Sequence, residues 1–411
     1  MIAVQRMFGA VVVLVGVQVF AQDGGADALS EVAAVDGGTD EVQAQRERDR
    51  LGGESAAALL GQETAAGKFT FAGTVEAFYQ WNFNQPSDQV TAFRGFDNRH
   101  NTFTIANAVL DARWDFKQVV GRLALQIGHT PSTYYLAEPG FGPGAGTNAT
   151  GIELWKYLQQ ANVGYSFDIG RGVLVDTGIF LSPIGPEAMQ VKDNWNFSRS
   201  NLFYGLPYYH TGVRVSVPLS DRWTVTVAGF NGWNSVVDGN DGKSLMAQGT
   251  YTIEGKLAAS FLYFGGPERP RGAAEGQPWR HLVDAHVTWI TGPRFSLLVH
   301  ANAGAEPNAR GLSGWVAGAL YGRVTLTDWL FVAGRADVFV EQTPTGAASI
   351  FWAAPWMASQ TLTVEAKPHP QVSARLEYRH DEAGGPVFST RNGPLTGPRQ
   401  DTLTLGLTTW F

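Results

Sequence analysis

The chain ends in DTLTLGLTTWF, residues 401–411, and this stretch alternates apolar with polar or small residues. Leu403, Leu405, Leu407 and Phe411 fall on one parity, which Thr409 interrupts, and the positions between them are mostly Thr and Gly. A period of two residues indicates a β-strand with two unlike faces. An unpaired strand of this kind would aggregate, so the sequence predicts that a larger sheet covers it.

The same alternation recurs from residue 68 onward. In KFTFAGTVEAFYQWNFN, residues 68–84, and HPQVSARLEYRH, residues 369–380, aromatic and aliphatic side chains oppose polar and charged ones. The pattern predicts about sixteen strands, with 14–18 compatible with it. The predicted strands are 68–84, 100–116, 119–129, 157–168, 172–181, 209–219, 222–231, 243–254, 256–265, 279–290, 294–304, 312–326, 329–341, 350–366, 370–380 and 400–411.

The links between these strands alternate in length. Tight turns such as EGK at 254–256 and LTDW at 326–329 alternate with links of about 10 to 30 residues. Short periplasmic turns, long extracellular loops and an even number of strands are typical of bacterial outer-membrane barrels. We therefore predict an all-β fold, a transmembrane antiparallel β-barrel. Closure of the sheet would pair every backbone polar group inside the hydrocarbon.

Composition and the N-terminal sequence divide the chain into three parts. Charged residues make up 16% of the chain, against about 25% in soluble domains, and no cysteine is present, which excludes disulfides and thiolate chemistry. Residues 1–21 have the basic start, apolar run and small cleavage residue of a signal peptide. Residues 22–67 carry ten acidic residues and three arginines, which predicts a disordered periplasmic segment. Residues 68–411 form the predicted barrel.

A barrel of about sixteen strands leaves a water-filled lumen, so the polar face of each strand predicts the pore lining. Arginines on the inner face could set a mild anion preference, or the charges could pair across strands and only support the wall. The pore-lining or constriction candidates are Glu76, Asp111, Arg113, Arg122, Glu187, Lys192, Asp193, Arg199, Arg214, Arg335, Asp337, Arg375, Glu377 and Arg379. Other predicted inward residues are Asp176, Arg280, Asp284, His286, His300 and Arg323.

Two features complicate this pattern. Phe103, Ile105, Leu262 and Phe264 fall on the face assigned to the lumen, which predicts either a local bulge or an interior packed by a loop. The link 181–210 is long, apolar and aromatic enough to pack against other groups. We expect it to fold into the lumen and narrow the channel, and an outer cap is the alternative.

Several stretches resemble the putative β-barrel porin-2 (OmpL-like) family of outer-membrane proteins over residues 70–411. They are GTVEAFYQWNFNQPSD (73–88), RGFDNRHNTF (94–103), NFSRSNLFYGLPYYHTGVRVS (196–216) and FNGWNSVVDGNDGKS (230–244). The resemblance implies an outer-membrane porin without established catalytic residues. It also implies that the aromatic last strand, through Leu405, Leu407, Trp410 and Phe411, is the signal read by the barrel-insertion machinery.

The sequence thus favours a porin that lets small hydrophilic solutes or ions diffuse across the outer membrane. The alternatives are a plugged structural or adhesive barrel and, more remotely, a barrel enzyme. No catalytic residue, cofactor or metal is expected, because no GxSxG or HExxH motif is present and the eight His are scattered. The expected partners are outer-membrane lipids, the insertion machinery, small solutes and, by analogy with other porins, a homotrimer, but no nucleic acid.

Overall fold

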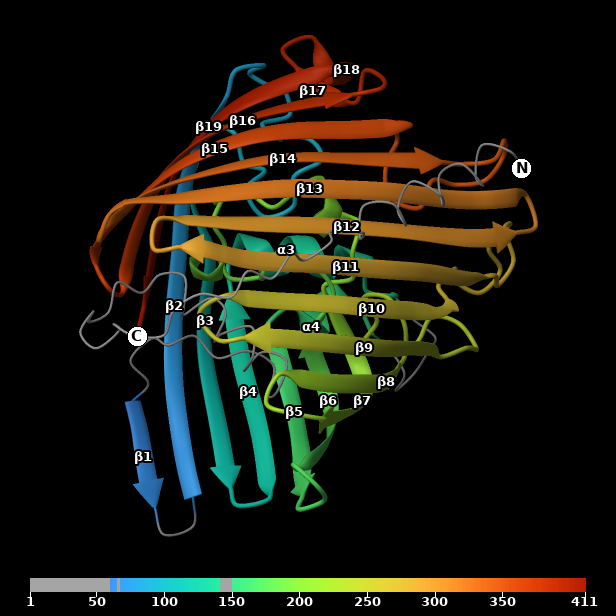
Figure 1. Ribbon diagram of the computed structural model, residues 1–411. Helices are drawn as coiled ribbons and strands as arrows, with labels where there is room; N and C mark the ends of the chain where they lie inside the picture. Colours follow the sequence, from blue (N-terminus) through green and yellow to red (C-terminus); the bar gives the residue numbers. More distant parts are fainter. Residues whose placement is uncertain (1–59, 65–66, 141–149) are drawn as a thin grey trace, which may run out of the picture. The chain divides into compact units, whose positions relative to one another are not determined.

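The computed structural model describes residues 60–64, 67–140 and 150–411, and sixteen of its strands close into one antiparallel barrel (Figure 1). The predicted signal peptide and most of the acidic segment lie outside the described residues. The strands are β1 (Leu60–Thr64), β2 (Gly67–Asn82), β3 (Phe103–Phe116), β4 (Val119–Ile127), β5 (Leu158–Phe167), β6 (Val173–Leu181), β7 (Tyr209–Pro218), β8 (Trp223–Phe230), β9 (Ser244–Ile253), β10 (Leu257–Pro267), β11 (Trp279–Gly292), β12 (Phe295–Asn308), β13 (Gly311–Thr327), β14 (Leu330–Gln342), β15 (Trp356–His369), β16 (Val372–Ala383), β17 (Phe388–Thr390), β18 (Gly393–Gly397) and β19 (Arg399–Trp410).

Short helices occur only in the links among the described residues. They are α3 (His129–Tyr134), η1 (Tyr135–Ala137), α4 (Ile152–Trp155), η3 (Val191–Asp193) and α5 (Asn201–Tyr204). Within that part of the chain, no helix has the length and apolar character needed to cross a membrane.

The barrel closes where β19 pairs with β2, in register from Thr402 opposite Asn82 to Trp410 opposite Thr74. The last residue, Phe411, continues the pairing by exchanging two backbone hydrogen bonds of 3.0 and 3.1 Å with Gly73. Leu403, Leu405, Leu407 and Phe411 are exposed on the outer face, while the threonines at 402, 404 and 408 are buried inside. The terminal alternation therefore separates a lipid face from an inner face, and the predicted fold class is confirmed.

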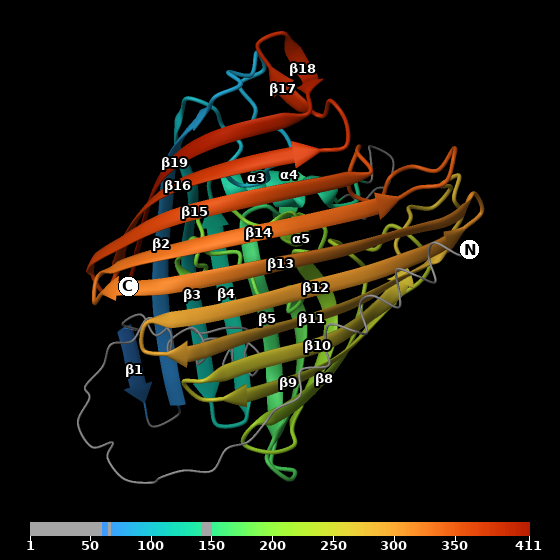
Figure 2. The ribbon, with the colours of Figure 1, turned by 45° about the horizontal axis from the view of Figure 1, so that its top comes forward.

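One short strand precedes the barrel. The chain runs through Leu60–Thr64 in β1 and pairs with the first residues of β2, with Leu60 opposite Phe71. These five residues belong to the acidic segment predicted to be disordered, whereas the structure gives them an extended, paired backbone. β1 and the end of β19 thus lie on the same edge of β2, one after the other (Figures 1 and 2).

The largest differences from the predicted strand ends occur at the end of β12 and the start of β15. β12 and β13 run to Asn308 and from Gly311, so the outer link predicted at 305–311 contains only residues 309 and 310. Pro307 lies inside this ladder, opposite Leu312. Conversely, residues 350–355, predicted as strand, belong to the link before β15, and their apolar side chains pack inside the barrel.

The apolar residues on the predicted lumen face have two different explanations: a bulge in β3 and an interior packed by loops at β10. β3 carries a bulge, because Glu76 pairs with Asn107 while the next residue of β2 pairs with Ile105. This extra residue turns Phe103 and Ile105 outward, where they are 84% and 55% exposed. Leu262 and Phe264 instead point inward and are fully buried. They belong to an apolar core that lies inside the barrel.

This inner core lies at the long-loop ends of the strands. Its wall residues lie within four positions of this end of their strands. They include Met246 on β9, Phe264 on β10, Leu282 on β11, Trp315 on β13, Phe339 on β14 and Met357 on β15; at β13 the link is only residues 309 and 310. Side chains from the long links cover them, among them Leu202 and Leu206 after β6 and Trp352 before β15. Near the long links the inner face from β9 to β15 thus carries large apolar side chains together with a few buried charges, such as Arg280, Glu306 and Glu341. Near the short turns it is polar, as at Thr226, Thr250, Ser260 and Arg323.

Candidate functional site: the lumen and its inserted segment

Residues 182–208, between β6 and β7, fold into the barrel and are called here the inserted segment. Its apolar side chains Ile184, Trp195 and Leu202 are buried in the inner core, which explains why the segment enters the lumen rather than capping it. The helix α5 of this segment is capped by Ser200, whose hydroxyl accepts a hydrogen bond of 3.2 Å from the Phe203 amide. The inward fold is thus the arrangement that the structure has.

Carboxylates of the barrel wall hold backbone amides of the inserted segment. Glu76 on β2 accepts a hydrogen bond of 2.6 Å from the amide of Val191. Glu377 on β16 accepts from the amides of Phe197 and Ser198 at 2.6 and 2.9 Å. Asp337 on β14 accepts from the Asn201 amide at 2.9 Å. Because buried amides need acceptors, these carboxylates fix the path of the segment.

Arginines of the same wall hold its backbone carbonyls. Arg375 donates to the carbonyls of residues 191 and 196 at 2.7 and 3.3 Å. Arg335 donates to the Ser198 carbonyl at 2.6 Å, and Arg379 donates to the carbonyl of residue 199. The three arginines are at most 3% exposed. They therefore bind protein groups rather than line open water.

The same arginines also pair with wall carboxylates. Arg335 lies 3.1 Å from Asp337, Arg375 lies 2.7 Å from Glu365, and Arg379 lies 2.7 Å from Asp381. Arg375 pairs across strands, whereas Arg335 and Arg379 each pair with a carboxylate two positions further along their own strand. Charges this deeply buried stay ionised only when such partners compensate them.

The link between β2 and β3 also contributes charged side chains to this network. Arg94, in the link after β2, lies 2.5 Å from Asp97 and 3.1 Å from Asp381. Sequence analysis missed Arg94, Asp97, Glu365 and Asp381 as candidates. The RGFDNRHNTF stretch was a usable signal for the first two, and Asp381 lay one residue beyond the predicted end of its strand.

The remaining candidates of the inserted segment have different surroundings. Glu187 accepts from the Ser200 amide at 3.0 Å and lies 3.2 Å from Arg335. Arg199 donates to the Phe197 carbonyl at 3.0 Å, whereas Lys192 pairs with its neighbour Asp193 at 3.1 Å. Burial changes along the segment: residues 194–203 are buried, whereas several residues between 186 and 193 are half-exposed. The half-exposed residues, called here the rim, are Pro186, Glu187, Ala188, Gln190, Lys192 and Asp193.

Charged side chains on β3, β4, β6 and β7 form two separate groups. On β3 and β4, Asp111 lies 2.9 Å from Arg113 and 2.6 Å from Arg122, so two guanidinium groups share one carboxylate. Further round the wall, Arg214 on β7 pairs with Asp176 on β6 at 2.7 Å. The predicted candidates thus fall into an anchoring network and a separate charged wall. The first of the two wall groups carries a formal charge of plus one.

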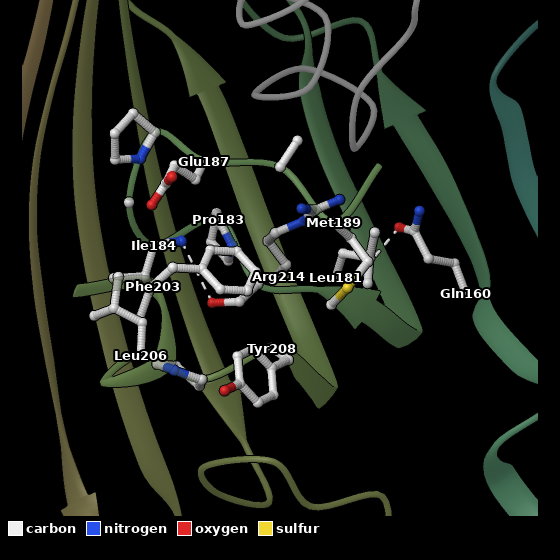
Figure 3. A pocket seen from close by; sticks show the side chains of 15 residues that line it. Gln160, Leu181, Pro183, Ile184, Glu187, Met189, Phe203, Leu206, Tyr208 and Arg214 are labelled. Atoms are coloured by element: carbon white, nitrogen blue, oxygen red, sulfur yellow. Dashed lines mark hydrogen bonds between the residues drawn. The ribbon is translucent and has the colours of Figure 1, made fainter. Parts of the chain in front are cut away.

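A cavity of about 90 Å³ lies between the inserted segment and the wall (Figure 3). Gln160 on β5 and Arg214 on β7 contribute to its lining, and the two halves of the inserted segment supply most of the rest. Among the described residues, no cluster of three or more His, Asp or Glu has an arrangement that could hold a metal ion.

The sequence of this chain matches a known protein family. The family model described as putative beta-barrel porin-2, OmpL-like, matches residues 68–411. The chain belongs to this family. The resemblance inferred from the motifs is thereby confirmed, and the family and its fold indicate the outer membrane. The comparison with curated proteins gives no match.

Solved structures with a similar fold are distant in sequence. Outer-membrane expressed OmpT of Vibrio cholerae aligns with a TM-score of 0.55 at 10% identity, covering 85% of this chain and all of that one. The anion-selective porin from Comamonas acidovorans aligns with a TM-score of 0.54 at 12% identity, covering 84% and 100%. A trimer form of in-vitro folded OmpT gives 0.53 at 10% identity, again covering 84% and 100%. At these identities the likeness establishes the barrel fold alone.

Proposed function

We propose that this member of the porin-2 family is a passive channel for small hydrophilic solutes or ions. The observation that carries the proposal is the difference between the two parts of the inserted segment. Residues 194–203 are packed into the wall network, whereas the rim is half-exposed. A water-filled path between the rim and the charged wall of β3 to β7 accounts for this exposure. The aperture would then lie off the centre of the barrel.

The charges along such a path favour anions weakly. Asp176 neutralises Arg214, and Asp193 neutralises Lys192, but Asp111 is shared by Arg113 and Arg122. One net positive charge beside a narrow aperture attracts anions and repels cations. A similar fold occurs in a porin described as anion-selective, which is compatible with this preference and does not establish it.

The proposal includes the placement of the chain in the membrane. Short turns of outer-membrane barrels face the periplasm, so β1 and the residues before it would begin on the periplasmic side. The acidic segment would then lie in the periplasm. A homotrimer is the proposed assembly, in line with the trimer form of one structural neighbour.

Electrical recording in planar bilayers tests the channel. Purified barrel should give discrete current steps, and a salt gradient should give a reversal potential on the anion side. Liposomes that carry the protein should swell in small sugars. Absence of current steps from protein that is shown to be folded and inserted would contradict the proposal.

A plugged structural barrel is the second candidate, because of the inner apolar core. Phe264, Leu282 and Phe339 are fully buried inside the barrel, under side chains of the long links. An open pore does not need such a core at its outer end. The two candidates differ in the same recording, because a plugged barrel inserts without conducting.

A further inference from the structure

The cavity beside the inserted segment differs from the rest of the interior. Its lining is mostly apolar, with Ile184, Met189 and Leu206 from the segment and Leu181 from the end of β6. Pro186 and Ala188 of the rim are half-exposed and belong to the same lining, so the cavity has an entrance toward the proposed path. A solute that passes the rim would meet this cavity.

One cation of the lining has an unused hydrogen-bonding edge. Arg214 is 5% exposed, and its Nε and Nη2 donate to the two oxygens of Asp176 at 3.1 and 2.7 Å. The ring of Phe180 lies 4.4 Å from the guanidinium carbon. No hydrogen-bond partner of Nη1 is present among the described residues. Nη1 keeps some accessible surface, so an acceptor carried by a ligand can reach it and form a charge-assisted hydrogen bond.

The other charged group of the lining is already satisfied. Both oxygens of Glu187 accept from the amide of Ser200 at 3.0 Å, and Arg335 lies 3.2 Å away. Glu187 therefore offers little attraction to a cation. In Figure 3, Arg214, Gln160 and Glu187 are the charged or amide side chains among predominantly apolar ones. The lining as a whole suits a molecule with an apolar body and one acceptor group.

The volume limits the size of that molecule. A cavity of 90 Å³ holds roughly six waters at about 15 Å³ of probe volume each, and their share of liquid volume is about 180 Å³. An organic solute of about six to nine non-hydrogen atoms occupies a comparable space. Butyrate and benzoate fall in this range.

We propose that this cavity is a binding site for small monocarboxylates with an apolar body, which bind with the carboxylate on Nη1 of Arg214. The site rests on the proposed function, because it lies on the proposed path, and it names the class of solute that the path retains. A carboxylate would accept one charge-assisted hydrogen bond from Nη1, and its hydrocarbon part would cover Ile184 and Leu206.

Binding is tested on the complete barrel in detergent, by equilibrium dialysis with labelled butyrate or benzoate. Wild-type protein should bind both saturably and should not bind butylammonium, which has the same apolar body and the opposite charge. The double substitution Arg214→Gln with Asp176→Asn removes the cation without leaving a buried carboxylate unpaired, and it should weaken binding about tenfold. Ala188→Leu should weaken binding by filling the cavity.

A control substitution separates the cavity from general effects. Thr177→Leu adds the same side chain as Ala188→Leu on an exposed position of β6, and binding should stay at the wild-type level. Equal binding of butyrate and butylammonium, or unchanged butyrate binding in both cavity variants, would overturn the proposal. The result is independent of conductance. Saturable binding without current steps would contradict the proposed channel and support the binding site. Current steps without saturable binding would support the channel and contradict the binding site.

Discussion

Replacement of Glu377 by glutamine should release the inserted segment from the wall. The carboxylate is 1% exposed and accepts three hydrogen bonds, from the amides of Phe197 and Ser198 and from the Thr363 hydroxyl, at 2.6, 2.9 and 2.7 Å. A glutamine amide has one oxygen, and its NH2 group would face a donor. At least one of these donors therefore loses its acceptor, and the remaining bonds lose the charge.

The expected size of the effect follows from these contacts. A hydrogen bond to a charged group contributes about 1.5 to 3 kcal/mol, so loss of one bond and weakening of another should cost about 2 to 4 kcal/mol. If the cost falls on local opening of residues 194–201, the open population rises about 30- to 700-fold, since each 1.4 kcal/mol is about tenfold. Hydrogen exchange of these amides, followed by mass spectrometry in detergent, measures that population directly.

Glu306→Gln is the matched control. Glu306 is also fully buried on the inner wall, but it pairs with Arg269 and Arg280 at 2.7 and 2.8 Å and holds no part of the inserted segment. Its replacement should leave exchange of residues 194–201 unchanged. Exchange in E377Q within about threefold of wild type, a change of less than about 0.7 kcal/mol, would refute the anchoring role. An equal rise in both variants would show a general loosening of the barrel instead.

Three further predictions concern other parts of the molecule. Phe411→Asp should lower the amount of heat-modifiable barrel in the outer membrane, because it removes the aromatic end of the closing strand; wild-type amounts would contradict this. Asp111→Asn should shift the reversal potential further toward anions, because Arg113 and Arg122 lose their shared carboxylate. If one charge acts through water at about 7 Å, the anion-to-cation permeability ratio should rise about sevenfold, since the anion gains and the cation loses about 0.6 kcal/mol. An unchanged potential would place this triad away from the path. Burial lowers the pKa of His129 to about 4, so the folded state keeps the imidazole neutral. The stability that it contributes is present above the ordinary pKa of about 6.5 and is lost as the pH falls toward 4. Protease cleavage near this residue should therefore increase between pH 7 and pH 5 in wild type and less in His129→Gln.

The fold could be predicted because a barrel strand carries its own signature. Side chains that face lipid are mostly apolar whatever residues surround them. The outer face of a strand, as at Leu403, Leu405 and Leu407, can therefore be recognised from its own sequence. Strand ends were less certain, since Pro307 looks like a loop residue and yet lies within a ladder. The bulge in β3 could only be suspected, because its register depends on the partner strand.

The interior could be predicted only in part. Sequence periodicity places Arg335 and Arg379 on the inner face, but it cannot say what fills the space in front of them. Both donate to backbone carbonyls of the inserted segment, 137 positions away from Arg335 and 180 positions away from Arg379. Phe264 and Phe339 are apolar although they point into the barrel, because side chains of the long links cover them. Such packing depends on tertiary structure and cannot be seen in the local sequence pattern.

Because β1 and β19 pair with the same edge of β2, the chain could be circularly permuted. Phe411 pairs opposite Gly73, and Leu60 pairs opposite Phe71, so the end of the last strand and the start of β1 are only two residues apart along the same neighbour. A short peptide should be able to connect them without disturbing either ladder. New ends cut into one of the short turns would then give a circularly permuted barrel with the same sixteen neighbours, in which the closing seam becomes an ordinary continuous strand.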